Sequence, residues 1–129
     1  MKNYQINSKI ADFLTQNNYK CFLPQRDTPQ GRHKLTAETN IKAIQDSDII
    51  FIIGKNLGND TSSETGFAKG LGKKTVLLLT DSELEIIKKS IMIFFLVDTV
   101  LHLSSYSELN PILDILDHHN LDRNNFVNN

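Results

Sequence analysis

Two kinds of apolar pattern alternate along the chain: short uninterrupted runs and stripes with helical spacing. Apolar runs without alternation at residues 48–53 and 75–79 are typical of strands that are covered on both faces of a sheet. Residues 97–103 predict a third apolar strand. A shorter apolar and aromatic run at residues 19–23 stops at Pro24 and also predicts a strand. Because helical stripes separate these runs, the pattern predicts a parallel sheet.

Apolar residues three and four positions apart predict the helices that connect the strands. The expected helices cover residues 7–18, 36–45, 61–71 and 107–118, with a partly helical stretch at 82–95. In the second of these helices, Ile41 and Ile44 form the expected buried stripe. Gly72 and the two lysines after it are typical of a helix C-terminus. The sequence therefore predicts a single α/β domain, a flavodoxin-like or Rossmann-like parallel sheet flanked by helices.

The two ends of the chain raise a question about the sheet. We expect the domain to span residues 1–119, and the Asn-rich residues 120–129 to form a polar tail that frays. Open α/β sheets usually begin with a strand, often the central one, whose loop helps to build the ligand site. Residues 1–5 are too few and too polar for such a strand. Three explanations stay open: the strand is lacking, a partner or a rearranged sheet edge replaces it, or the reading frame begins too late.

Composition and charge restrict the class of protein. With 14 basic and 15 acidic side chains among 129 residues, the chain has a net charge of −1 and no electrostatic footprint for nucleic acid or an anionic membrane. Its longest apolar stretches, at 49–53 and 91–97, are far shorter than the roughly 20 residues that span a bilayer. A single cysteine, Cys21, suggests a reducing compartment, and residues 1–9 lack an apolar signal-peptide core. We expect a soluble cytoplasmic protein that binds neither nucleic acid nor a membrane.

Ligands bind to parallel sheets in the loops that follow the strands. In the loop after residues 48–53, Thr61 and Glu64 have the spacing of a capping box at a helix N-terminus. Glu64 then either satisfies a backbone N–H or acts as a carboxylate that the helix N-terminus keeps ionised. An ionised carboxylate can attack a sugar carbon or stabilise an oxocarbenium ion. Gly66 and Gly70, one turn apart, indicate that this helix approaches the sheet closely.

Other residues are weaker candidates for chemistry. His118 and His119 lie near Asp114, but two adjacent histidines at a helix end are usually solvated. We expect His102 in the core or at the edge of the sheet. The chain has no G-x-G-x-x-G or Walker-type loop for a dinucleotide or a triphosphate. The sequence therefore predicts neither a metal nor a cofactor.

Several segments, in this order, carry a likeness to a known family. They are Phe22-Leu23-Pro24-Gln25-Arg26-Asp27, the residues from Asn40 to Asp48, the apolar run at 48–53, Ser63-Glu64-Thr65-Gly66-Phe67-Ala68, Leu71-Gly72-Lys73-Lys74 and, after the next strand, Thr80-Asp81. Together they resemble the nucleoside 2-deoxyribosyltransferase family, from about residue 7 to residue 117. The resemblance implies a flavodoxin-like fold, a homo-oligomer of two or more chains, and cleavage of the N-glycosidic bond of deoxynucleosides. The sugar passes to a second base, or, in relatives, to water.

The resemblance also implies catalytic roles. Glu64 falls on the position of the nucleophile that attacks C1′. Asp60 would orient Glu64 or the 5′-hydroxyl group of the substrate, and its alternative is a turn or N-cap residue. Asn40 falls near the substrate, and its alternative is a polar residue on an exposed helix face.

Further implied contacts are with the base and the neighbouring chain. Gln25, Arg26 and Asp27 would lie over the base, because they offer donors and acceptors to a heterocycle edge; the alternative is a solvated turn after Pro24. Ser90, where the family has Asn, and Met92 match a segment that a neighbouring protomer contributes. Substrate contacts are thus expected at Gly66, Ser90 and Met92.

Two other functions stay open. A chain with this fold can be a non-catalytic nucleotide-binding or interaction module. It can also be a related glycosidase that cleaves another N-ribosyl compound. The expected partners are a small nucleoside or nucleotide and further copies of the chain.

Overall fold

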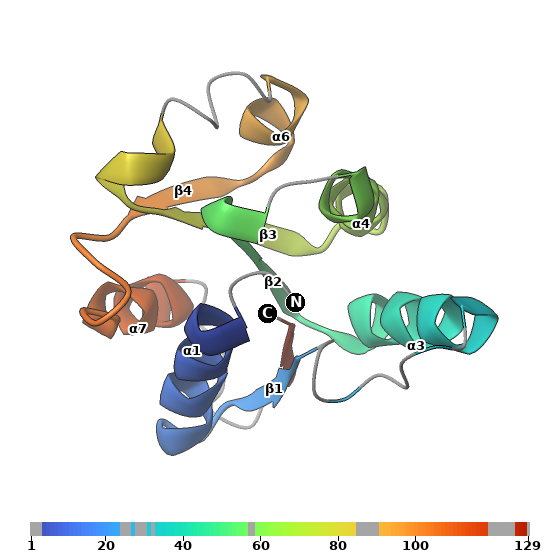
Figure 1. Ribbon diagram of the computed structural model, residues 1–129, viewed down its shortest axis with the longest axis horizontal. Helices are drawn as coiled ribbons and strands as arrows, with labels where there is room; N and C mark the ends of the chain where they lie inside the picture. Colours follow the sequence, from blue (N-terminus) through green and yellow to red (C-terminus); the bar gives the residue numbers. More distant parts are fainter. Residues whose placement is uncertain are drawn as a thin grey trace.

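Five parallel strands form one sheet in the described part of the chain (Figure 1). The structure is a computed structural model that describes residues 4–23, 27, 31, 33–56, 59–84, 91–118 and 126–128. The strands are β1 (Lys20–Phe22), β2 (Ile49–Ile53), β3 (Lys74–Leu79), β4 (Thr99–His102) and β5 (Phe126–Asn128). Their order across the sheet is β1-β5-β2-β3-β4, and every pair is parallel.

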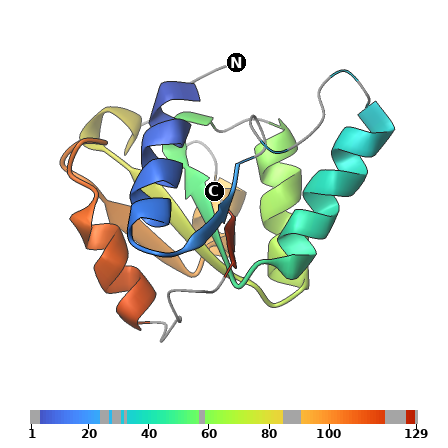
Figure 2. The same cartoon turned by 90° about the horizontal axis from the view of Figure 1, so that it is seen from below.

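Helices cover both faces of this sheet (Figures 1 and 2). On one face lie α1 (Tyr4–Gln16) and α7 (Asn110–His118), and on the other lie α3 (His33–Asp46), α4 (Asn59–Gly70) and α6 (Ile91–Leu96). Short 3-10 turns, η1 (Gly54–Asn56) and η2 (Asp81–Glu83), follow β2 and β3. The predicted α/β, flavodoxin-like architecture is confirmed. In the described residues, no helix combines the length and apolar character needed to cross a membrane.

The central strand β2 is buried along its whole length. Ile49, Phe51 and Ile53 pack in the apolar layer beneath α1 and α7. Ile50 and Ile52 pack in the opposite layer, beneath α3, α4 and α6. Because successive side chains of a strand point to opposite faces, an uninterrupted apolar run is what two covered faces require. The prediction for this strand is confirmed.

The position between β1 and β2 is taken by β5, a strand from the end of the sequence. It pairs with all three residues of β1 and with Ile49 and Ile50 of β2. The expectation of a fraying tail is therefore wrong for Phe126–Asn128, because buried backbone N–H and C=O groups of β1 and β2 need partners on this side. In the flavodoxin-like order 2-1-3-4-5, this position belongs to the first strand. A rearranged sheet thus accounts for the strand that we did not find near residue 1.

The boundaries of α4 differ from the prediction at one end and agree at the other. The helix begins at Asn59, so Thr61 is an internal residue and not the N-cap. Residues 59–61 are Asn, Asp and Thr, which all favour the start of a helix. The spacing of Thr61 and Glu64 therefore did not identify the first residue of this helix. At the other end, Gly72 has a φ of +75° and its N–H donates to the Lys69 carbonyl at 3.0 Å. With the bond from the Lys73 N–H to the Ala68 carbonyl, this is a Schellman motif, and the predicted C-terminus is confirmed.

The expected close approach of α4 to the sheet at its glycines is wrong. A Cβ atom built on Gly66 or Gly70 would have no atom within 4 Å. Thr65 and Ala68 are instead the buried residues of this helix, and each successive residue is rotated by about 100° around the helix axis. The two glycines therefore lie on sides of α4 that do not touch the sheet.

At the amino ends of the strands, Asp98 joins β3 to β4. Its carboxylate accepts the Thr75 N–H at 2.9 Å, and Lys69 Nζ lies 2.9 Å from the other oxygen. Burial alone would raise the pKa of Asp98, but the hydrogen bonds from Lys69 and Thr75 outweigh it and hold the pKa below its ordinary value. These contacts hold the start of β4 beside the start of β3.

Candidate functional site

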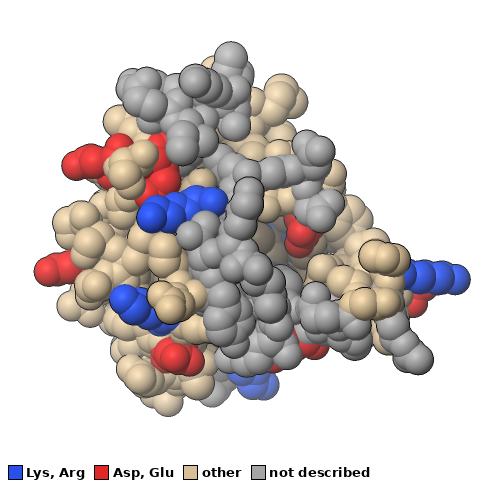
Figure 3. All heavy atoms as spheres, viewed as in Figure 1, with Lys and Arg blue, Asp and Glu red and all other residues tan. Residues whose placement is uncertain are grey.

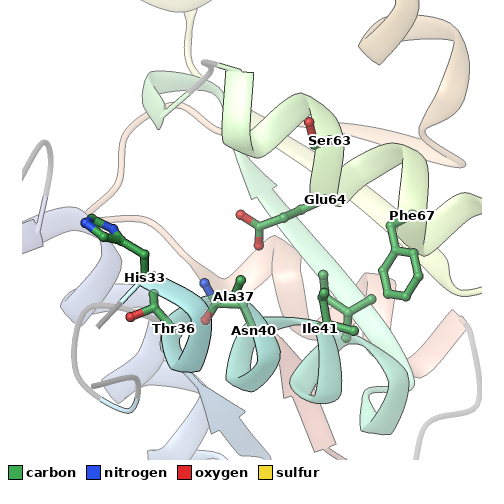
Figure 4. A pocket seen from close by; sticks show the side chains of 9 residues that line it. His33, Thr36, Ala37, Asn40, Ile41, Ser63, Glu64 and Phe67 are labelled. Atoms are coloured by element: carbon green, nitrogen blue, oxygen red, sulfur yellow. The ribbon is translucent and has the colours of Figure 1, made fainter. Parts of the chain in front are cut away.

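A pocket of about 480 Å³ lies between α3 and α4 (Figure 4). Its described lining residues are His33, Thr36, Ala37, Asn40, Ile41 and Ile44 of α3 and Ser63, Glu64 and Phe67 of α4. Both helices follow parallel strands, so their N-terminal halves lie towards the carboxyl edge of the sheet, where parallel sheets bind ligands. The volume falls within the range of small-molecule sites.

The Glu64 side chain extends from α4 into this pocket (Figure 4). It is half-buried, so it is neither enclosed by packing nor directed into bulk solvent. Because α4 begins at Asn59, Glu64 lies in the second turn of the helix and not at the third position. The predicted capping box at Thr61 and Glu64 is therefore wrong, and the effect of the helix dipole on this carboxylate is weaker than the sequence suggests.

Asn40 lies on α3 opposite Glu64, and the two side chains point towards one another across the pocket (Figure 4). The Asn40 side chain is half-buried, and Thr36 lines the pocket one helical turn before it. An amide offers both donors and acceptors, so it can contact a carboxylate or a sugar hydroxyl group. The fold thus brings together two residues that the sequence analysis singled out separately.

Each of the two helices also contributes an apolar side chain to the pocket. Ile41 of α3 is 44% exposed and Phe67 of α4 is 37% exposed, and both line the pocket. The expectation that Ile41 is buried together with Ile44 is wrong, although Ile44 itself is only 1% exposed. Residues three apart on a helix differ in direction by about 60°, and this difference directs Ile44 into the core and Ile41 towards α4.

The remaining predicted site residues are not brought into the pocket among the residues that the structure describes. The backbone of Asp60 lies in the first turn of α4, and its side chain is outside the described part. Gly66 is half-buried on α4, and Met92 is 70% exposed on α6. Gln25, Arg26 and Ser90 lie outside the described residues.

Asp27 contacts the end of β1. Its carboxylate accepts the Leu23 N–H at 2.9 Å, and its own N–H donates to the Leu23 carbonyl at 2.8 Å. Asp27 is not among the described lining residues of the pocket. The contact of Asp27 with a base, which the resemblance implied, has no support in this geometry.

Sequence reasoning missed a second carboxylate at the carboxyl edge. Glu83 of η2 is only 2% exposed and accepts hydrogen bonds from the Thr80 N–H at 3.3 Å, the Ser82 hydroxyl at 2.8 Å, the Thr80 hydroxyl and the Tyr106 hydroxyl. Burial alone would raise the pKa of Glu83, but the hydrogen bonds from Thr80, Tyr106 and Ser82 together hold it below its ordinary value. Burial and the adjacent carboxylate raise the pKa of Tyr106.

A signal for this cluster was present in the sequence. Thr80 and Glu83 have the same T-x-x-E spacing as Thr61 and Glu64, and here the N-cap backbone does bond to the glutamate. Tyr106 follows β4, so the cluster ties the connection after β4 to the connection after β3. None of these residues belongs to the described lining of the pocket, and we assign the cluster a structural role.

Other polar groups lie outside the pocket. His102, at the end of the edge strand β4, places its Nε2 atom 2.6 Å from the Asp81 carboxylate, and both side chains are exposed. Within the described ranges, no three His, Cys, Asp or Glu side chains are grouped as a metal site would need; His119 is outside those ranges. On the face seen in Figure 3, acidic and basic side chains are interspersed.

Comparisons of the chain with models of protein families, with curated proteins and with solved structures gave no match. The fold and the pocket define the class of the molecule: an α/β protein with a pocket between two helices. Its function has to be argued from the side chains in that pocket.

Proposed function

We propose that this protein cleaves the N-glycosidic bond of a deoxynucleoside or a deoxynucleoside monophosphate, with Glu64 as the nucleophile. One observation carries the proposal: the half-buried Glu64 carboxylate points into a pocket of about 480 Å³ and faces Asn40. The resemblance of the segments around both residues to nucleoside 2-deoxyribosyltransferases supports the same chemistry.

The reaction proceeds in two displacements at C1′. A Glu64 oxygen bonds to C1′ while the bond to the base nitrogen breaks, and the base leaves with that electron pair and takes up a proton. A second base or a water molecule then attacks C1′, loses a proton, and releases the Glu64 carboxylate. Asn40 would hold the sugar or the carboxylate in position, and Asp60 would orient Glu64 or the 5′-hydroxyl group. This chemistry needs neither a metal nor a cofactor.

Incubation with deoxynucleosides and a different free base, followed by chromatography, tests the proposal. A new deoxynucleoside is the product expected of a transferase, and free base with deoxyribose or its phosphate is the product expected of a hydrolase. Calorimetric binding of deoxynucleosides without any turnover would contradict the proposal and favour a non-catalytic binding module. Cleavage of ribosyl compounds alone would favour the related glycosidase.

We also propose that the active form is a cytoplasmic homo-oligomer of two or more chains, joined through α6. Phe95 and Met92 on this short helix are 83% and 70% exposed, and Phe94 is also exposed. Neighbouring exposed apolar side chains of this size mark protein–protein contacts.

Replacing Phe95 with Asp is expected to lower the molar mass measured by light scattering towards that of one chain, because a charge would have to be buried in the interface. Leu35→Asp, at an exposed apolar residue of α3, is the matched control and keeps the mass of the unaltered protein. A single-chain mass for the unaltered protein at all concentrations would contradict the prediction.

A further inference from the structure

The pocket between α3 and α4 changes from polar to apolar along its length (Figure 4). Thr36, Asn40 and Glu64 lie at the end nearer the N-termini of the two helices. Ile41, the residue after Asn40, and Phe67, three residues after Glu64, line the pocket further along. A ligand that fits this arrangement has a polar part and a flat apolar part joined to each other.

Ile41 and Phe67 are large apolar side chains that water reaches in the structure described here. Because they lie on opposite walls of one pocket, a single flat ligand placed between them would remove apolar surface of both from water. An aromatic ring also stacks on the face of a nucleobase. Their exposure is thus accounted for by a planar heterocycle more directly than by a sugar.

The spacing on α4 sets the relation between the two parts of the ligand. Glu64 and Phe67 are three residues apart, so they are neighbours on one face of the helix, with about 5–6 Å between their Cβ atoms. A sugar whose C1′ lies at the Glu64 carboxylate therefore carries its base next to the Phe67 ring.

We propose that the nucleobase binds between Phe67 and Ile41, stacked on the Phe67 ring, while the sugar lies beside Glu64 and Asn40. This inference rests on the proposed function and adds the direction in which the substrate lies and the residue that holds its base. It moves the base contact away from Asp27, whose carboxylate bonds to the backbone of Leu23. Because stacking depends little on the edge of the base, purines and pyrimidines both bind.

Replacing Phe67 with Ala is expected to weaken the binding of free adenine and free cytosine about 10-fold, as loss of one stacking ring does elsewhere. The KM for deoxynucleosides rises by a similar factor while kcat changes little, because this contact exists before the reaction as well as during it. Leu71→Ala is the control, because Leu71 is an exposed apolar residue just beyond α4 and is not among the described lining residues.

The absence of tryptophan from the chain allows a second measurement. Phe67→Trp introduces a single indole at the proposed stacking position, and its fluorescence is expected to be quenched by free adenine or cytosine but not by 2-deoxyribose. Leu71→Trp carries the same fluorophore outside the pocket, and its fluorescence stays unchanged at the same base concentrations.

The outcomes separate the inference from the proposed function. Turnover with an unchanged KM in Phe67→Ala, together with no quenching in Phe67→Trp, overturns the inference and leaves the proposed function standing. Base binding that depends on Phe67, without turnover of any deoxynucleoside, supports the inference and overturns the proposed function. If the protein neither binds bases nor turns over deoxynucleosides, both are overturned.

Discussion

Glu64→Gln is expected to lower kcat for base exchange or base release by at least about a thousandfold, as loss of a nucleophile does in other enzymes. The amide has nearly the shape of the carboxylate, so the pocket persists, but it is a poor nucleophile towards C1′. The rate is measured by chromatography of the deoxynucleoside and the free base, and circular dichroism checks that the fold is retained.

Glu38→Gln is the matched control for this variant. Glu38 is an exposed residue of the facing helix α3, it lies 3.9 Å from Lys34, and it is not among the described lining residues of the pocket. Glu38→Gln makes the same chemical change at an exposed position outside the described lining of the pocket. The activity of this variant should stay within about twofold of that of the unaltered protein, as for other surface substitutions. Undiminished turnover in Glu64→Gln would end the assignment of Glu64 as nucleophile.

Glu83→Ala is expected to lower the free energy of unfolding by about 3 kcal/mol, because a buried carboxylate with several donors is lost. The hydroxyl groups of Tyr106 and Thr80 would remain in the core without their acceptor. Tyr106→Phe removes only one of these bonds and should cost about 1.5 kcal/mol. Urea denaturation measures both values, and Glu108→Ala, at an exposed glutamate, should change stability by less than about 0.5 kcal/mol.

The same cluster predicts a pH dependence of stability. Hydrogen bonds hold the pKa of Glu83 in the folded protein below its ordinary value. Between the lower folded pKa and the ordinary pKa, the folded protein therefore binds fewer protons at Glu83 than the unfolded chain does. The stabilisation is therefore complete above the ordinary glutamate pKa of about 4.3 and is lost as the pH falls through the lower folded value. The stability difference between the unaltered protein and Glu83→Ala should shrink over that range, and a difference that grows on acidification would contradict the assignment.

The two T-x-x-E segments show what a sequence pattern can and cannot establish about a carboxylate. Thr61 and Glu64 have the capping-box spacing, yet the helix begins earlier and Glu64 faces a pocket. Thr80 and Glu83 have the same spacing and do form the backbone contact of a cap, with the carboxylate buried. The two glutamates differ in how deeply they are buried and in the side chains around them. Both properties depend on residues that lie far away in the sequence.

The sequence by itself determined the buried strands β2 and β3, because an uninterrupted apolar run is stable only where both faces of a strand are covered. It also determined that α4 ends just before Gly72, whose left-handed conformation favours glycine, and it singled out Glu64 and Asn40. These results depend on neighbours along the chain.

Only the tertiary structure decided that Phe126–Asn128 completes the sheet between β1 and β2, because the backbone groups that need a partner there come from segments far away in the sequence. In the same way, the packing of α3 beside α4 decided that Ile41 lines a pocket with Phe67 and that Asn40 faces Glu64. Apolar residues at helical spacing predict which side of a helix is apolar. Whether each of these residues faces the core or a neighbouring helix depends on where that neighbouring helix lies.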